Sequence, residues 1–169
     1  VINTERCTSI GTADDLFIMT VEHLLSAISA LSIDNICVEV IGEEIPLVDG
    51  CSQSFFDLIH EAGISEQEPE KRVISITEPI YVVEGLSTII ALPSDHLKFS
   101  VSFINDHHHP ALSNQFLEFT LDAECYRRDI APARTFGFKS EAEILIKKGL
   151  IKGVDLEHVV IIDDNSIAT

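Results

Sequence analysis

Apolar residues at helical spacing mark two segments in the first third of the chain. The first helix is predicted over 21–31, where four apolar residues share one face: Leu24, Leu25, Ile28 and Leu31. Thr20 is its predicted N-cap. The second helix is predicted to follow Ser52 or Ser54 and to end at Gly63, with one apolar face: Phe55, Phe56, Leu58, Ile59 and Ala62. Two helices with one apolar face each predict packing on one side of a small sheet.

Runs rich in β-branched residues predict the strands. In the first part of the chain, residues 36–41 form such a run. The polar segment 65–71 then has the composition of a linker, which predicts a domain boundary. Beyond it, short apolar runs separated by turn residues predict an antiparallel meander over 72–76, 80–84, 87–92 and 97–103, and a further strand over 116–121.

In the last third of the chain, the order strand, helix, strand predicts a small βαβ unit. A short helix or turn is predicted before it, over 125–130. Ser140 and Glu143 have the spacing of a capping box, which starts a helix predicted over 141–148. The apolar run 159–162 is continuous instead of alternating, as expected for a strand that is covered on both faces.

The negative net charge of the chain argues against nucleic acid and anionic membranes as binding partners. With 11 Lys+Arg against 28 Asp+Glu, the formal net charge is −17, and a surface of that sign repels nucleic acid and anionic membranes. No run of about eighteen apolar residues is present, so no transmembrane segment is predicted. An anionic substrate would require a local basic pocket, for which four residues are candidates: Arg127, Arg128, Arg134 and Lys139.

The four cysteines, Cys7, Cys37, Cys51 and Cys125, form no C-x-x-C pair. Neither a zinc knuckle nor a redox motif is therefore indicated, and we expect reduced thiols in the core. The chain begins with Val1 instead of Met, and its final residues follow directly on a strand-like run. These features predict a fragment of a longer protein.

Candidate chemistry lies at the start of the first helix, where Glu22 precedes His23. A neutral imidazole is a metal ligand, and consecutive helical residues point about 100° apart, so Glu22 can stand beside a metal bound by His23. That geometry suits a general base acting on water at a metal. An acid–imidazole pair is also common in helices that bind no metal. The two-histidine helix motif is absent, so a metal on His23 requires ligands from elsewhere in the chain.

Three consecutive histidines, His107, His108 and His109, interrupt the strand pattern. They are consistent with a metal site or with a solvated loop. Adjacent residues in an extended chain point in opposite directions, so the three side chains cannot all reach one ion.

Several motifs occur together in one order: Thr-Val-Glu-His-Leu at 20–24, Ile-Asp-Asn at 33–35, Glu-Ile-Pro-Leu-Val-Asp-Gly at 44–50 and Ala-Arg-Thr-Phe-Gly-Phe at 133–138. In these motifs the chain resembles the zinc-dependent UDP-3-O-acyl-N-acetylglucosamine deacetylases of lipid A biosynthesis. The segments 149–150 and 160–164 agree as well. The resemblance extends over nearly the whole chain from about Cys7.

The resemblance implies an α+β fold of two similar domains, each a two-layer sandwich of a sheet and two helices, with the active site between them. The first domain would span 1–66 without its opening strands. The second would span 71–169 without its C-terminal part, and would contain a βαβ insert at about 133–163. The implied reaction hydrolyses the 2-acetamido group of a UDP-linked acylated glucosamine and releases acetate, with Zn²⁺ polarising the attacking water. We expect a monomeric, cytoplasmic enzyme.

The resemblance also assigns roles to individual residues. His23 corresponds to the first zinc ligand, Glu22 to the general base, and Thr135 to the residue that stabilises the oxyanion. A hydroxyl donor suits that last role.

Three phenylalanines correspond to substrate contacts in the family. Phe136 and Phe138 fall where the family contacts the substrate and its acyl chain, and Phe103 resembles an aromatic residue that stacks on uracil. The alternative for all three is ordinary packing in the core.

The chain departs from the family pattern in two places. The H-K-x-x-D segment that supplies the other zinc ligands, and a later histidine that serves as general acid, do not occur up to Thr169. Catalytic zinc usually has three protein ligands, so the chain alone is predicted to be inactive. The second departure is an insertion at 104–108, next to Phe103.

Two other functions stay open at this point. One is a degenerate relative that binds a nucleotide sugar, or another protein, without metal. The other is a different metal hydrolase that uses the histidines at 107–109 together with His23.

Overall fold

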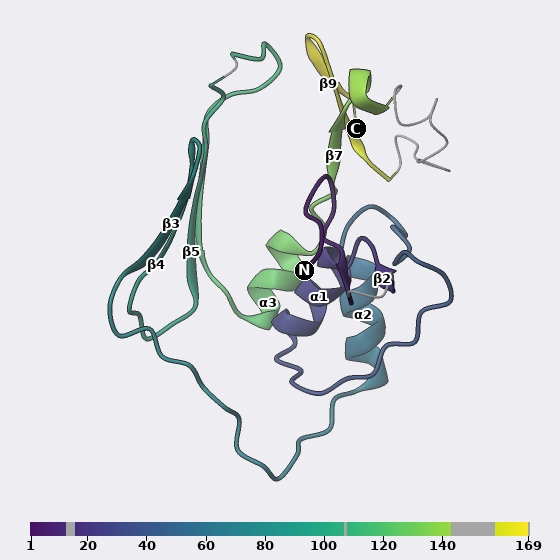
Figure 1. Cartoon of the computed structure of the whole chain (residues 1–169), viewed down its shortest axis with the longest axis vertical. Coiled ribbons are helices and arrows are strands. Elements are labelled where there is room, and N and C mark those ends of the chain that lie inside the picture. The colour runs from purple at the N-terminus through teal and green to yellow at the C-terminus, as the bar shows by residue number, and fades with distance from the viewer. Residues whose placement is uncertain (13–15, 107, 143–157, 169) are drawn as a thin grey trace.

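The structure is a computed structural model that describes residues 1–12, 16–106, 108–142 and 158–168. Three helices lie near the N-terminus (Figure 1): α1 (Glu22–Ala30), α2 (Gln53–Ala62) and α3 (Ala123–Cys125), which continues into the π-helix η1 (Tyr126–Ile130). Residues 139–142, after Phe138, are also helical. The core lies where α1, α2 and η1 meet and contains Ala27, Ala30, Phe56, Tyr126 and Ala131. Alanine has a small side chain, so α1 approaches the rings of Phe56 and Tyr126 closely; the centroids of those two rings are 5.5 Å apart.

The strands form four small sheets. β1 (Ile10–Gly11) pairs with β2 (Phe17–Ile18), β3 (Ile80–Glu84) with β4 (Ser87–Ala91), and β5 (Lys98–Phe103) with β6 (Gln115–Thr120), all antiparallel. In the fourth sheet β8 (Val160–Asp163) lies between β7 (Phe136–Phe138), which is parallel to it, and the antiparallel β9 (Ser166–Ala168). Figure 1 shows the hairpins β3–β4 and β5–β6 to one side of the helices.

Both predicted helices are present, but the predicted cap of the first is wrong. Val21 occupies the N-cap position of α1, and no side chain caps the helix there. Thr20 has a φ of 58° and its hydroxyl donates to Glu44 Oε1 at 2.7 Å. The hydroxyl is therefore directed to the turn at 43–45 and not to the amides of α1. α2 follows Ser52 and ends at Gly63, which has a φ of 84°, as predicted, but the side chain of Ser52 makes no capping hydrogen bond.

Two predicted strands are wrong. Residues 36–41 and 72–76 are irregular in the structure. A β-strand is stable only when a neighbouring strand takes up its backbone hydrogen bonds, and no strand pairs with either segment in the part of the chain that the structure describes. The meander is also wrong as predicted: β5 pairs with β6 over six residue pairs instead of extending the β3–β4 hairpin.

The parallel pair β7–β8 agrees with the predicted βαβ unit. The helix predicted over 141–148 begins earlier than predicted, because residues 139–142 are helical and Ser140 lies within the helix instead of capping it; residues 143–148 lie outside the described residues. The arrangement of the elements as two sandwich domains, with a boundary at 65–71, stays a prediction.

The cysteines are all free thiols, but only Cys51 is buried. Burial raises the pKa of the Cys51 thiol, which favours its protonated form. Cys37 is exposed, so its predicted place in the core is wrong, because the segment around it is not a strand of a covered sheet. Among the residues that are described, no helix is long and apolar enough to cross a bilayer.

The hairpins leave much apolar surface uncovered. The chain exposes 13265 Å², whereas a compact monomer of 18.7 kDa exposes about 8,300 Å². On β3 and β4, Tyr81 and Ile89 are 72% and 76% exposed. The described helices therefore do not cover these hairpin faces.

Candidate active site

The first half of the candidate site is the first turn of α1. Glu22 and His23 are both half-buried there. The backbone amide of Thr8 donates to Glu22 Oε2 at 2.9 Å, and the carbonyl of Thr8 accepts from the amide of Val21 at 3.2 Å. The segment before β1 thus holds both the backbone and the acid of this turn. A carboxylate has two oxygens, so the bond at Oε2 is compatible with proton transfer at Oε1.

The second half is Thr135, which immediately precedes β7 and is half-buried. Its amide donates to the carbonyl of Gly50 at 2.8 Å, and its own carbonyl accepts from the amide of Val160 at 2.9 Å. Gly50 has a φ of 78° and is packed so closely against the carbonyl of His158 that a Cβ at position 50 would overlap it. The turn at Asp49–Gly50 therefore sets the position of the Thr135 backbone.

Two links connect these halves. Arg6 forms an ion pair with Glu141, three residues beyond β7, while Thr8 in the same segment holds Glu22. The amide of Ser52, at the start of α2, donates to the carbonyl of Ala131 at 3.1 Å. Residues 6–8 thus join the Glu22–His23 turn to the segment after β7, and the start of α2 joins the segment that leads to Thr135.

The structure brings together two of the three predicted substrate-contacting phenylalanines. The rings of Phe136 and Phe138 are 6.3 Å apart in an edge-on arrangement. The side chains of Phe136 and Phe103 are 61% and 43% exposed. Neither ring is therefore packed in a core formed by the described residues. Phe103 lies at the end of β5, opposite Gln115, and among the described residues it makes no ring contact with the other two.

The histidine loop between β5 and β6 is organised by Asn105. Its side-chain amide donates to the carbonyls of His109 and Leu112, both at 2.9 Å, and its side-chain oxygen accepts from the amide of His109 at 2.9 Å. The imidazole of His109 lies 5.6 Å from the ring of Phe138. The loop therefore contacts the phenylalanine pair. His107 lies outside the described residues.

The four residues proposed for a basic pocket have partners. Arg127 pairs with Asp57 at 3.1 Å, Arg128 with Asp129 at 2.6 Å, and Lys139 with Asp163 at 2.7 Å. Arg134 also takes part in an interaction. Three of the four cations thus lie beside a carboxylate, which reduces their attraction for an anionic substrate.

His23 is a candidate metal ligand of the expected type, and the described residues contain no complete metal site. No group of three His, Cys, Asp or Glu side chains is placed to hold an ion within the described ranges. In particular, His23 does not form such a group with His108 or His109. The imidazole of His23 suits zinc chemically, but the other ligands that catalytic zinc requires would have to come from residues outside this described set.

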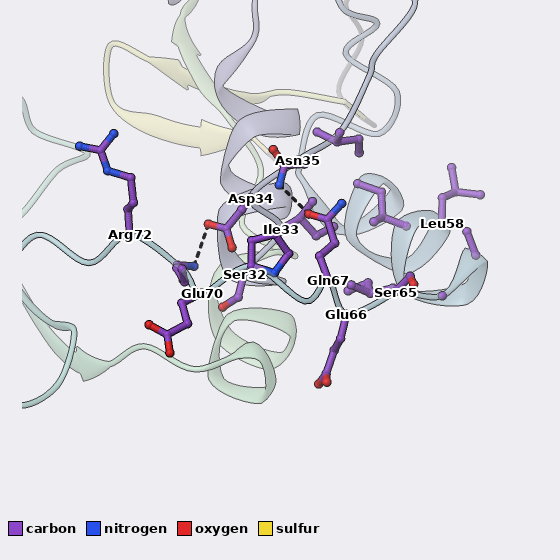
Figure 2. A pocket seen from close by; sticks show the side chains of 17 residues that line it. Ser32, Ile33, Asp34, Asn35, Leu58, Ser65, Glu66, Gln67, Glu70 and Arg72 are labelled. Atoms are coloured by element: carbon purple, nitrogen blue, oxygen red, sulfur yellow. Dashed lines mark hydrogen bonds and ion pairs between the residues drawn. The ribbon is translucent and has the colours of Figure 1, made fainter.

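A cavity of about 1140 Å³ lies at the other end of the helices (Figure 2). It is bounded by the residues after α1 and by the segment 62–72, which are joined by an ion pair of 3.0 Å between Lys71 and Asp34 and by a bond of 2.7 Å from Asn35 to Gln67. None of the predicted site residues lines it.

Comparison with known proteins decides the family. A family model described as UDP-3-O-acyl N-acetylglycosamine deacetylase (LpxC) matches residues 1–169. The chain belongs to this family. Three relatives with the name UDP-3-O-acyl-N-acetylglucosamine deacetylase are similar over almost the whole chain. That of Leptospira biflexa is 39% identical over 98% of this chain and 54% of the relative. The proteins of Wolinella succinogenes and Helicobacter pylori are 41% and 38% identical over 99% of this chain and over 55% and 56% of their own lengths.

This LpxC-family chain therefore spans about half the length of the curated relatives it matches. The family resemblance predicted from the motifs is confirmed. The roles predicted for the individual site residues stay predictions, because the match is to the chain as a whole.

The structure adds residues to this LpxC-family site that the sequence did not indicate. Thr8 and Arg6 hold the Glu22–His23 turn and the segment after β7. Tyr126 and Ser26 lie in a hydrogen-bonded chain that reaches the carbonyl of His23. Apart from the bond between Ser26 and His23 within α1, these contacts join residues 14 to 135 positions apart, so no local spacing in the sequence signals them.

Asp49 belongs to the motif at 44–50, and its surroundings favour the ionised carboxylate. Burial acts to raise the pKa of its carboxyl, but hydrogen bonds from the Ser54 hydroxyl at 2.8 Å and from Cys51 outweigh it, so the pKa lies below the ordinary 3.8. A carboxyl with a depressed pKa stabilises the folded state above its unfolded pKa and loses that contribution as the pH falls through the folded value.

We expect Ser54→Ala to lower the free energy of unfolding by about 1–2 kcal/mol at pH 7. The loss should shrink as the pH falls below about 3.8, the ordinary pKa of an unfolded aspartate, and through the lower pKa of the folded carboxyl. Urea unfolding of the full-length protein between pH 3 and pH 7 measures this. In an Asp49→Asn background the cost of Ser54→Ala should no longer vary with pH; a cost that still varies would mean that another group is responsible.

Proposed function

We propose that the full-length protein hydrolyses the 2-acetamido group of UDP-3-O-acyl-N-acetylglucosamine and releases acetate, as a zinc-dependent deacetylase of lipid A biosynthesis. The observation that supports this most directly is that the chain, a family member over residues 1–169, retains Glu beside His in the first turn of α1. A protein that only bound a nucleotide sugar would have no need of that acid. We also propose that the protein is a cytoplasmic monomer, and that its fold is completed as two sandwich domains.

We assign the following roles to residues of this chain. Glu22, oriented by the amide of Thr8, takes a proton from the attacking water. Thr135, held by Gly50 and Val160, donates its hydroxyl to the oxygen on which negative charge develops. Phe136 and Phe138, with His109 against them, offer an apolar surface for the acyl chain.

His23 would be one zinc ligand, with the remaining ligands supplied by residues outside the described set. When bound, zinc would supply Lewis acidity toward the water and the amide carbonyl.

Metal removal tests the proposal. We expect the full-length protein to contain about one zinc per chain, to release acetate from the UDP-sugar, to lose this activity on dialysis against a zinc chelator, and to regain it when zinc is added. His23→Ala should abolish both zinc content and activity. His96→Ala, which removes an exposed imidazole elsewhere in the chain, is the matched control and should change neither.

Zinc-loaded full-length protein that binds the UDP-sugar but releases no acetate would contradict the proposal and favour a binding domain. His23→Ala protein that keeps its zinc would contradict the assignment of the ligand.

A further inference from the structure

A chain of three hydroxyls joins α1, α2 and η1. The Tyr126 hydroxyl donates to Ser52 Oγ at 2.7 Å and also lies 2.7 Å from Ser26 Oγ. The Ser52 hydroxyl donates to the carbonyl of Ala131 at 3.4 Å, and the Ser26 hydroxyl donates to the carbonyl of His23 at 2.8 Å. The single hydroxyl proton of Ser26 is directed at the carbonyl of His23, and in the contact of 2.7 Å between Ser26 and Tyr126 either hydroxyl can be the donor.

The two ends of this hydroxyl chain lie in the two halves of the candidate site. One end is the carbonyl of His23, in the same helical turn as Glu22. The other is the carbonyl of Ala131, which also accepts from the amide of Ser52 at 3.1 Å. Ala131 is four residues before Thr135, whose amide is bound by Gly50, two residues before Ser52. Tyr126 is the residue that connects the two ends.

The middle of the chain is shielded from water. Tyr126 is 3% exposed and Ser52 is 6% exposed, and the tyrosine ring packs against Phe56. In such surroundings hydrogen bonds are strengthened, and a hydroxyl that loses its partner is not compensated by solvent. The deletion of one oxygen at position 126 would therefore loosen both carbonyl contacts while the ring remains in the core.

We propose that Tyr126 is a positioning residue of the active site, which acts through Ser26 on the His23–Glu22 turn and through Ser52 on the segment that leads to Thr135. The inference rests on the proposed function, because it requires that these residues be the zinc ligand, the base and the oxyanion donor. It assigns to the phenolic hydroxyl a role beyond packing.

The test is Tyr126→Phe in the full-length zinc enzyme. We expect kcat to fall about fivefold, the equivalent of one hydrogen bond, with KM changed less than about twofold. The absorption spectrum of the cobalt-substituted enzyme should shift, because the imidazole of His23 moves relative to the ion. Hydrogen exchange at the amides of residues 22–26 should become faster, and this last measurement does not depend on any activity.

Two controls separate positioning from general loosening. Tyr81→Phe removes the hydroxyl of an exposed tyrosine on β3 and should change nothing. Ile28→Val shortens a buried side chain of α1 without touching the hydroxyls, so it should lower stability while kcat and the cobalt spectrum stay as in wild type. In a Ser26→Ala background, the further change Tyr126→Phe should leave the exchange at residues 22–26 nearly unaltered, because the path to His23 is already cut.

Wild-type kcat, spectrum and exchange in Tyr126→Phe would overturn the proposal, as would an equal loss of kcat in Ile28→Val. If the wild-type protein releases no acetate, the proposed function fails. Faster exchange at 22–26 in Tyr126→Phe, but not in Ile28→Val, would then still support the coupling of Tyr126 to the α1 turn.

Discussion

Glu22→Gln is expected to lower kcat of the full-length protein by a factor of about 10²–10⁴, the usual contribution of a general base. The glutamine side chain has the shape of the glutamate, and its oxygen still accepts a hydrogen bond from the amide of Thr8, which is 2.9 Å from Glu22 Oε2. The turn that presents His23 should therefore keep its position and its zinc. What the substitution removes is the ability to take a proton from the attacking water.

Steady-state kinetics together with zinc analysis of the same preparation measure this effect. Glu44→Gln is the matched control: Glu44 is an exposed acid beside the start of α1 that accepts from the Thr20 hydroxyl at 2.7 Å. It should retain wild-type kcat. A Glu22→Gln enzyme with full zinc content that keeps more than about a tenth of wild-type kcat would show that another group is the base.

The sequence predicted the elements that form from local contacts. The 3,4 spacing of apolar residues located α1 and α2, and short apolar runs with turn residues between them located β3–β6. The runs at 36–41 and 72–76 have the same composition as strands but are irregular. A strand requires a partner that a single run does not reveal. Likewise, nothing in the sequence predicted that residues 126–130 would form a π-helix.

The candidate site divides in the same way. Glu22 and His23 were found because neighbouring residues in one helical turn have a fixed relation, and Thr135 was found through a motif. The residues that hold them, Thr8 and Tyr126, are distant in the chain from what they bind. Their roles depend on how segments pack together, and packing is the step that spacing in a sequence does not specify.

Gly50→Ala is expected to have the largest effect on stability of the substitutions considered. Gly50 has a φ of 78°, a conformation that costs an L-residue about 1–2 kcal/mol. A Cβ at this position would also overlap the carbonyl oxygen of His158, so the segment that enters β8 would have to move. Overpacking of this kind costs about 1–3 kcal/mol more. We therefore expect a total loss of about 2–5 kcal/mol in the free energy of unfolding.

The same displacement should also move Thr135, the proposed oxyanion donor. The carbonyl of Gly50 accepts from the amide of Thr135 at 2.8 Å, and the carbonyl of Thr135 accepts from the amide of Val160 at 2.9 Å. A shift of about 1 Å in a catalytic group can cost about 10²-fold in rate, so kcat should fall by that order in whatever fraction remains folded. Gly85→Ala is the matched control: Gly85, in the turn between β3 and β4, has a φ of 57° and nothing within 4 Å of an added Cβ. It should show the backbone cost alone, with unchanged kcat. If urea unfolding gives the two variants equal losses, the contact between Gly50 and His158 does not hold Thr135 in place.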